Sequence, residues 1–380
     1  MDPAVLKAML PYYSAEYGNP SSMHSSGRRA GGVIARVRRE VADILNALPG
    51  EIIFTGSGTE SDDTAILGVA RASRTYGDHV IISSIEHKAV LESAHALQKE
   101  GFSVSIVPVG SDGILDVKAC MKLVTDKTVL ISVMYANNEI GTIQPIAELG
   151  KAIRAFRGEK AFPLFHTDAC QAAGALDLDV KRLGVDLMSL NGSKIYGPKG
   201  VGVLYKKFGV TIEPLIVGGE QEAHLRAGTE SVPLIVGFGA ALAASNTMRE
   251  KESARLIVLR DYFIAGLLKK IPTAILNGHP TKRLPNNVHI SIPHVEGEAI
   301  LLMLDREGVE ASTGSACSAY DLKPSHVLLA IGQTAEFAHG SIRFSLGRST
   351  TKKDLDRVLE VFPPITQRLS NISALTALSL

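Results

Sequence analysis

The sequence of 380 residues has few cysteines, almost no surplus of charge and no long hydrophobic run. Its three cysteines, Cys120, Cys170 and Cys317, lie far apart and form no cluster with histidines. Such a pattern excludes a disulfide scaffold and a structural zinc site. The formal net charge of +1 indicates neither nucleic acid nor an anionic membrane as a direct partner. Because no apolar run reaches the roughly 18 residues that span a bilayer, a membrane-spanning protein is excluded as well.

The order of apolar and polar stretches predicts an α/β protein with two domains. From about residue 51 to residue 205, short β-rich runs alternate with helical stretches. Unbroken apolar strands in such an alternation are typical of a mostly parallel sheet covered on both faces. After about residue 243 the pattern changes to a long helix followed by strands and shorter helices, which predicts a smaller α+β domain. The first residues, 1–4, lack the basic-then-apolar pattern of a signal peptide, which predicts a cytoplasmic location.

One lysine, Lys194, lies between two apolar runs, residues 185–190 and 201–205. We expect a loop between two buried strands to carry its ammonium group close to the interior. Burial favours the neutral amine, which is the nucleophile that forms Schiff bases. A lysine on an exposed hairpin explains this stretch equally well. The choice between these two interpretations depends on the other segments of the chain.

A segment of small residues, Thr55-Gly56-Ser57-Gly58-Thr59, follows the first predicted strand and opens a helix. Small residues let backbone N–H groups approach an anion, and the start of a helix adds a favourable dipole. The segment therefore suits a phosphate group. A glycine-rich turn with a helix cap is the structural alternative. The spacing matches neither the Walker A motif nor the Rossmann glycine pattern.

Polar residues also follow other predicted strands. His87 begins a helix, where it can cap the helix or stack on a planar ligand, and Asn138 can offer an amide to a ligand oxygen. Asp168 ends a buried strand and requires a cationic or hydrogen-bonding partner, a role that a protonated pyridine nitrogen fills. Ligands of such sheets bind beyond the carboxyl ends of the strands. An anion loop, a strand-end aspartate and Lys194 together predict a site for pyridoxal phosphate.

Six segments resemble those of cysteine desulfurases of the NifS/IscS type, which are class V aminotransferases of PLP fold type I. The segments cover nearly the whole chain in the right order and are residues 137–142, 166–171, 194–200, 226–229, 314–317 and 341–348. The resemblance implies a large PLP-binding domain, residues 13–245, with a mainly parallel seven-stranded sheet. It also implies a small α+β domain, residues 246–380, that carries Cys317, and an N-terminal segment, residues 1–12, that belongs to the small domain.

By this resemblance, Lys194 forms the Schiff base with pyridoxal 5'-phosphate and then moves the Cα proton of the substrate. Asp168 pairs with the pyridine nitrogen, and His87 stacks on the ring and passes protons to and from the substrate thiol. The resemblance implies further cofactor contacts from Gly58, Thr59, Asn138, Gln171, Asn191, Ser193 and Thr229. Because Thr229 is implied to reach the cofactor of the partner subunit, a homodimer is implied as well.

Cys317 decides which reaction the resemblance implies. It lies in a run of small residues, 312–319, which predicts an exposed, mobile loop rather than a buried thiol. As a thiolate it attacks the sulfur of the substrate L-cysteine, which leaves a persulfide on Cys317 and releases L-alanine. The substrate carboxylate is implied to bind Arg343, a task that suits a guanidinium, with help from Asn138. The sulfur then passes to acceptor proteins for iron–sulfur cluster assembly or tRNA thiolation. No resident metal is expected, and Cys317 meets iron–sulfur clusters at most transiently.

Two other functions stay open at this point. A selenocysteine lyase, or another enzyme of the class V aminotransferase fold, would share the cofactor residues, but Cys317 favours the desulfurase. A degenerate, non-catalytic homologue is suggested by departures from the family pattern. The chain starts after the usual first segment of the family, and residues 191–193 read Asn-Gly-Ser where Ser-x-His is usual. The joint presence of Lys194, Asp168 and Cys317 argues against that alternative.

Overall fold

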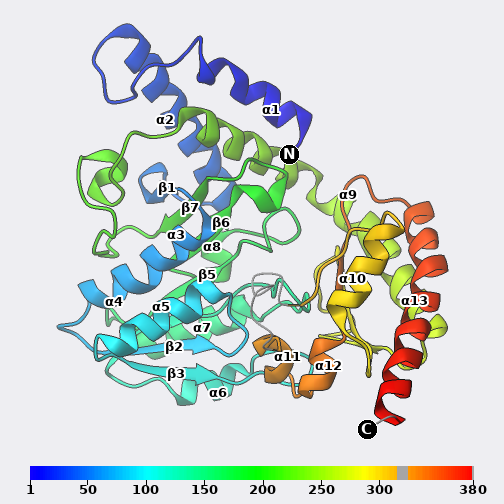
Figure 1. Ribbon diagram of the computed structural model, residues 1–380. Coiled ribbons are helices and arrows are strands. Elements are labelled where there is room, and N and C mark those ends of the chain that lie inside the picture. The colour runs from blue at the N-terminus through cyan, green and yellow to red at the C-terminus, as the bar shows by residue number, and fades with distance from the viewer. Residues whose placement is uncertain (315–323, 379–380) are drawn as a thin grey trace. The chain divides into compact units, whose positions relative to one another are not determined.

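The fold is that of a computed structural model, which describes residues 1–314 and 324–378 (Figure 1). By their internal contacts the described residues form two compact units. Unit 1 comprises Met1–Val107, Asp116–Tyr135 and Gln144–Arg249. Unit 2 comprises Pro108–Leu115, Ala136–Ile143 and the described part of Glu250–Leu380. None of the helices in these ranges combines the length and the apolarity that crossing a membrane requires.

Unit 1 is built on a seven-stranded sheet with the strand order β1-β7-β6-β5-β4-β2-β3. In chain order the strands are β1 (Ile52–Thr55), β2 (His79–Ser83), β3 (Ser103–Val107), β4 (Thr128–Ser132), β5 (Leu164–Asp168), β6 (Leu187–Asn191) and β7 (Gly202–Lys206). Pairing is parallel from β6 across to β3, and β7 runs antiparallel to both of its neighbours. The strands β2, β4 and β5 are buried along their whole length, as expected for a sheet covered on both faces. The prediction of a mainly parallel seven-stranded sheet is confirmed.

The helices of unit 1 connect these strands. They are α1 (Pro3–Met9), α2 (Ser25–Leu45), α3 (Gly58–Asp63), α4 (Val69–Ala72), α5 (Lys88–Lys99), α6 (Val117–Lys122), α7 (Ile146–Arg157), α8 (Val180–Leu183) and the first part of α9 (Val232–Lys270). Single tight or wide turns add η1 (Leu10–Tyr13), η2 (Pro49–Glu51), the π-helical η3 (Thr64–Gly68), η4 (Gly192–Ile195) and η5 (Gln221–His224). Helix α3 contacts β6 and β7, α5 contacts β2 and β3, and α7 contacts β5. These contacts bury the apolar strand residues.

The N-terminal residues group with unit 1, in contrast to the expectation that residues 1–12 belong to the small domain. The backbone N–H of Asp2 donates to the carbonyl oxygen of Tyr196 at 2.8 Å. Further along α1, the buried Met9 packs so closely on Gly237 that a side-chain carbon at Gly237 would lie 2.6 Å from the Met9 sulfur. Both partners belong to unit 1. The boundary between the units, at Arg249, falls inside α9, close to the boundary expected at residue 246.

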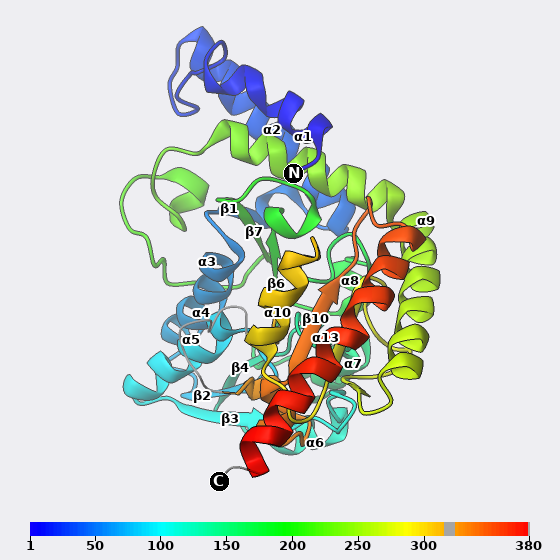
Figure 2. The same cartoon turned by 45° about the vertical axis from the view of Figure 1, so that its right-hand side comes forward.

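Unit 2 contains a three-stranded antiparallel sheet in the order β10-β9-β8. Its strands and helices are β8 (Ile275–Leu276), β9 (Asn287–Ser291), α10 (Gly297–Arg306), α11 (His326–Ala330), α12 (Ala335–His339), β10 (Ser341–Ser345) and α13 (Lys352–Leu378). Helix α10 contacts both β10 and α13, and the turned view makes this grouping clear (Figure 2). The core of the unit includes Phe344, whose ring meets the rings of Phe263 and Phe362 edge-on at centroid distances of 5.2 and 5.6 Å. The prediction of an α+β fold for this part of the chain is confirmed.

Candidate active site

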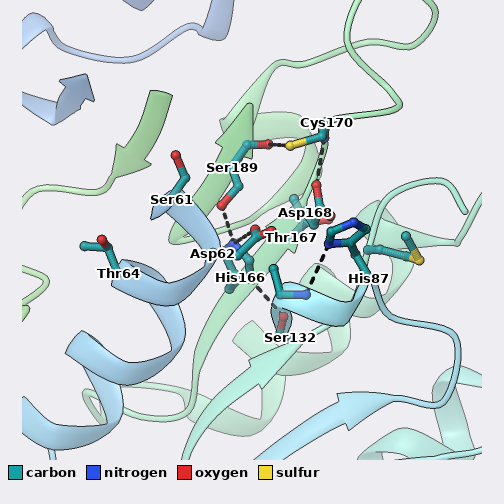
Figure 3. A network of polar contacts seen from close by, with 12 residues as sticks. Ser61, Asp62, Thr64, His87, Ser132, His166, Thr167, Asp168, Cys170 and Ser189 are labelled. Carbon is teal, nitrogen blue, oxygen red and sulfur yellow. Dashed lines mark hydrogen bonds and ion pairs between the residues drawn. The ribbon is translucent and has the colours of Figure 1, made fainter. Parts of the chain in front are cut away.

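Asp168 lies at the carboxyl end of β5. The strands β2, β4 and β6 end on the same side of the unit 1 sheet, because all four strands run in the same direction. Asp168 is the last residue of β5 and is buried. Its carboxylate accepts a hydrogen bond from the backbone N–H of Cys170 at 2.9 Å (Figure 3). The preceding Thr167 donates its hydroxyl to the carbonyl oxygen of Val133 at 2.7 Å, which ties β5 to the end of β4. Neighbouring groups thus hold the aspartate at the strand end, where the sequence predicted it.

The small-residue segment after β1 forms the start of α3. Ser57 caps this helix, since its hydroxyl accepts a hydrogen bond from the backbone N–H of Glu60 at 3.0 Å. The carboxylate of Glu60 in turn accepts from the backbone N–H of Gly56 at 2.8 Å and from Arg226 Nε at 2.9 Å. The loop is therefore braced by side chains on both sides. This leaves a helix start at residues 58–59, the geometry that suits an anion.

Gly58 brings this loop against the ends of two strands. A side-chain carbon at Gly58 would lie 2.7 Å from the sulfur of Cys170 and 3.2 Å from Cβ of Asn191. Since real side-chain carbons essentially never approach so closely, any larger residue would push the loop away. The structure thus places Gly58, Asn191 and the Asp168–Cys170 turn together, as a site shared by phosphate and ring requires.

Lys194 lies in the turn η4, directly after β6. Asn191 ends that strand, and its side-chain oxygen accepts from the backbone N–H of Ser193 at 3.1 Å and from the Ser193 hydroxyl at 3.2 Å. In contrast to the expectation of an ammonium held close to the interior, Lys194 is exposed. Burial raises the pKa of the Cys170 thiol well above its ordinary value, and the positive charge of Lys194 acts against this rise. The lysine is therefore close enough to the Asp168–Cys170 turn for its charge to be felt there.

His87 is half-buried and caps α5, where its Nδ1 accepts a hydrogen bond from the backbone N–H of Ala89 at 3.2 Å (Figure 3). A neutral imidazole that accepts at Nδ1 carries its proton on Nε2. The cap therefore fixes the ring and leaves Nε2 as the donor. Its helix follows β2, so His87 belongs to the same edge of the sheet as Asp168.

Two further residues that the resemblance implies lie in unit 1. Gln171 is half-buried and directly follows Cys170. Thr229 is exposed, and with Gly56 and Arg226 it lines a cavity of about 190 Å³. The structure thus places Thr229 beside the start of the small-residue loop.

A cluster of buried polar side chains lies near Asp168. The sequence analysis did not predict this cluster. Asp62 of α3 is hydrogen-bonded to Ser189, and its Oδ1 lies 3.7 Å from His166 Nε2 (Figure 3). His166 makes short contacts to hydroxyl oxygens on both sides, 2.8 Å to Ser132 and 3.0 Å to Ser189. Glu86 accepts a hydrogen bond from the backbone N–H of Met134 at 2.8 Å. The only signal in the sequence is the presence of acidic residues beside the small-residue loop and beside His87.

Burial shifts the pKa values of three members of this cluster. Burial, with the negative charge of Asp168 as the next cause, raises the pKa of Asp62 well above its ordinary value. Burial also raises the pKa of Glu86 to about 8 and lowers the pKa of His166 to about 3. Because Glu86 holds its proton at neutral pH, it adds little negative charge against the carboxylate of Asp168.

The predicted substrate residues lie in unit 2. Arg343, on β10, donates from Nη1 to the carbonyl oxygen of Asn138 at 2.9 Å. Both side chains are half-buried. The structure thus brings together the two residues that the resemblance assigns to the substrate carboxylate. Cys317 lies outside the described residues.

The residues of unit 1 fit a bound pyridoxal phosphate. The loop that Gly58 keeps against Cys170 and Asn191 offers backbone and hydroxyl donors to a phosphate. Asp168 offers a carboxylate to a ring nitrogen, and Lys194 offers an exposed amine on the next strand end. Within the described ranges, no group of three or more histidine, cysteine, aspartate or glutamate side chains could hold a metal ion.

A comparison with protein families decides the classification. The family described as Aminotransferase class-V matches residues 1–358. This chain belongs to the class V aminotransferases. It is 50% identical over 372 residues to a cysteine desulfurase IscS from Methanosarcina thermophila, a match that covers 98% of this chain and 91% of that protein. The NifS/IscS resemblance of the sequence is thereby confirmed.

Solved structures of similar proteins agree with this classification. A NifS-like protein superimposes with a TM-score of 0.89 at 36% identity and covers 97% of this chain and 96% of its own. A structure described as SspA in complex with cysteine has a TM-score of 0.78 at 34% identity and covers 91% of this chain and 95% of its own. The predictions of PLP fold type I, of a PLP-dependent enzyme and of pyridoxal phosphate as its cofactor are confirmed by membership of this family. The roles of the individual site residues stay predictions.

Proposed function

We propose that this chain is a cysteine desulfurase that removes the sulfur of L-cysteine, releases L-alanine and keeps the sulfur as a persulfide on Cys317. The observation that carries this proposal is the 50% identity over nearly the whole chain to a protein named cysteine desulfurase. It is supported by Cys317, by the exposed Lys194 beside the Asp168–Cys170 turn, and by the contact between Arg343 and Asn138. A similar solved structure is described as a complex with cysteine, which supports L-cysteine as the substrate.

The residues that the resemblance assigns to the cofactor would hold it. Gly58, Thr59, Asn191 and Ser193 would bind its phosphate, with Thr229 contributing from a second copy of the chain. Asp168 would face the ring nitrogen, Gln171 and Asn138 the ring hydroxyl, and His87 the face of the ring. When bound, pyridoxal phosphate supplies an aldehyde that takes up an amine and an electron-poor ring that stabilises negative charge at the substrate Cα.

Each remaining step belongs to a side chain of the protein. Arg343 orients the substrate through its carboxylate. Lys194 accepts the proton from the substrate Cα, and His87 moves the proton of the substrate thiol through Nε2. The thiolate of Cys317 forms an S–S bond with the substrate sulfur while the C–S bond of the substrate breaks. A proton takes the place of sulfur on the substrate Cβ, so that one cysteine and one thiol give one alanine and one persulfide.

We infer three further features of the working protein. Thr229 is exposed beside Gly56, which supports a homodimer in which each chain completes the other's phosphate site. The persulfide would be passed to acceptor proteins of iron–sulfur cluster assembly or tRNA thiolation, since a persulfide sulfur is readily attacked by another thiolate. The free thiols of Cys120 and Cys170 support a reducing, cytoplasmic location.

The proposal is tested by incubating the purified protein, loaded with pyridoxal phosphate, with L-cysteine and measuring alanine and sulfide. Lys194→Ala should lose the visible absorbance of the bound cofactor and the activity together. Lys199→Ala, which changes an exposed lysine of the same turn region, should keep both. Cys317→Ser should keep the absorbance and form no persulfide. Full turnover by Lys194→Ala would contradict the proposal, and activity on selenocysteine alone would favour a selenocysteine lyase.

A further inference from the structure

Glu139, in the polar segment Ala136–Ile143 of unit 2, has no role in the function proposed above. It is only 6% exposed. Its Oε2 accepts a hydrogen bond from the hydroxyl of Ser325 at 2.5 Å. Ser325 is buried as well and caps α11, because its hydroxyl oxygen also accepts from the backbone N–H of Leu328 at 3.3 Å. The carboxylate of Glu139 thus fixes the start of α11, which follows Cys317 in the sequence.

The same oxygen lies against the chain on the other side of Cys317. A side-chain carbon at Gly314 would lie 3.1 Å from Glu139 Oε2, 3.1 Å from the hydroxyl oxygen of Ser341 and 3.2 Å from His289 Nε2. Three polar atoms therefore lie so close to Gly314 that a side-chain carbon there would require them to move by a few tenths of an ångström. Gly314 and Ser325 both meet Glu139, although Cys317 lies between them in the sequence.

His289, which also lies close to Gly314, is a second buried polar residue beside this part of the chain. It is fully buried, and burial lowers its pKa to about 3, so the ring is neutral. The amide nitrogen of Asn277 lies 3.2 Å from His289 Nδ1 and also donates to the Ser291 hydroxyl at 2.8 Å. Nδ1 is therefore an acceptor, and the proton is on Nε2. Nε2 has no hydrogen-bond partner among the described residues, and it is the atom that lies against Gly314.

The polar segment also connects to the predicted carboxylate-binding arginine. Asn138 accepts from Arg343 through its carbonyl oxygen, and the next carbonyl, that of Glu139, accepts from the side chain of Asn287 at 2.8 Å. The backbone of Arg343 pairs in both directions with Ser312, at 2.7 and 3.1 Å. Neighbouring residues of one segment thus bind Arg343 and Ser325, and Glu139 also lies close to Gly314.

We propose that Glu139 is a positioning residue for persulfide formation: by binding Ser325 and packing against Gly314, it restrains the two points between which the chain carries Cys317. This inference rests on the proposed desulfurase function. Fixing both points reduces the number of directions from which the thiolate can meet the substrate sulfur. Restriction of this kind accelerates a reaction between two bound groups, and small losses of positioning cost large factors in rate.

The test compares Glu139→Ala, Glu139→Gln and Ser325→Ala with the exposed control Glu310→Ala, all loaded with pyridoxal phosphate. Three quantities are measured: cofactor absorbance, the affinity for L-cysteine from its spectral titration, and the rate of persulfide formation in the first turnover. Glu139→Ala and Ser325→Ala should slow persulfide formation about tenfold or more, with absorbance and affinity unchanged. Glu139→Gln keeps an oxygen acceptor for Ser325 and should lose less. Glu310→Ala should match the wild-type protein.

Alkylation of Cys317 by iodoacetamide separates positioning from a change in the thiol itself. Since Cys120 and Cys170 are buried, Cys317 should supply most of the reaction. A small reagent needs no particular orientation, so the variants should be alkylated as fast as the wild-type protein. Wild-type persulfide rates in both Glu139→Ala and Ser325→Ala would overturn this proposal alone, as would a loss of cofactor in step with the rate. Absence of persulfide in the wild-type protein would overturn the proposed function together with this proposal.

Discussion

The carboxylate of Asp168 lies among buried side chains whose pKa values are shifted toward their uncharged forms. Asp62 and Glu86 are buried acids whose pKa values are raised, and His166 is a buried base whose pKa is lowered. Each shift has burial as its largest cause, because an interior disfavours the charged form of either kind of group. Asp168 therefore faces little competing negative charge. This arrangement suits a carboxylate that has to pair with a cationic ring nitrogen.

Glu86→Gln tests the protonation of this cluster. The folded protein holds a proton on Glu86 up to about pH 8, whereas the unfolded chain releases it near its ordinary value of 4.5. Between these values a rise in pH stabilises the unfolded chain, so the free energy of unfolding falls by up to about 1.4 kcal/mol per pH unit. Glutamine keeps the shape of the neutral acid and has no proton to release.

Urea unfolding from pH 5 to pH 8 measures the effect. The stability of Glu86→Gln relative to the wild-type protein should rise steadily with pH. The control Glu310→Gln changes an exposed carboxylate elsewhere in the chain and should follow the wild-type curve. A constant difference between Glu86→Gln and the wild-type protein over this range would show that Glu86 is charged when folded.

At the scale of single residues, the sequence predicted which side chains lie at strand ends better than it predicted which groups surround them. Asp168 and His87 could be placed at strand ends from the alternation of strands and helices alone. The proximity of Asp62 to His166 could not, because it depends on how α3 lies across β5 and β6 rather than on any local pattern. The exposure of Lys194 also differs from the expectation. The turn η4 follows the strand end directly, so the side chain is not enclosed by the two apolar runs.

Among the elements, the start of α3 combines the most constraints. Ser57 caps the helix, Glu60 braces the loop, and Gly58 allows the loop to meet the ends of β5 and β6. A larger residue at Gly58 has no free space, since its nearest neighbours are the buried Cys170 and the strand residue Asn191. The proposed phosphate site therefore depends on the absence of a side-chain carbon at Gly58.

Gly58→Ala should weaken the affinity for pyridoxal phosphate and destabilise the protein by about 1–3 kcal/mol, because α3 has to shift. Gly32→Ala is the matched control, since it adds the same carbon to helix α2 where no atom lies within 4 Å. The control should gain up to about 1 kcal/mol, as alanine favours a helix over glycine. Cofactor titration and urea unfolding measure both effects. An unchanged cofactor affinity in Gly58→Ala would contradict the assigned phosphate site.

The element order could be predicted from the sequence, but the sheet order could only be predicted in part. Apolar runs separated by helical stretches identify each strand from β1 to β7, and right-handed crossovers favour parallel neighbours. The antiparallel course of β7 between β1 and β6 follows from the short connection through η4, which lets the chain return directly beside β6. Only the short turn η4 lies between β6 and β7, with no α-helix. This short spacing in the sequence indicates that the two strands pair antiparallel.

For the whole molecule, the residues of the proposed function are distributed over the two compact units. Of the residues that we propose act on the cofactor and the substrate, Gly58, Asp168 and Lys194 belong to unit 1, and Asn138 and Arg343 belong to unit 2. The match to the class V aminotransferases runs through residues 1–358, so it includes residues of both units. The central claim is that the residues of both units serve one reaction, in which an amine at Lys194 and a thiol at Cys317 act in succession.

Mass spectrometry of the Cys317 peptide after one turnover with L-cysteine tests this claim most directly. The protein is loaded with pyridoxal phosphate, mixed with substrate, trapped with an alkylating reagent and digested. The account predicts one added sulfur atom on Cys317 in the wild-type protein, none in Lys194→Ala, and one equivalent of alanine for each sulfur bound. Alanine formed without added sulfur on Cys317, or sulfur on Cys120 or Cys170 instead, would contradict it.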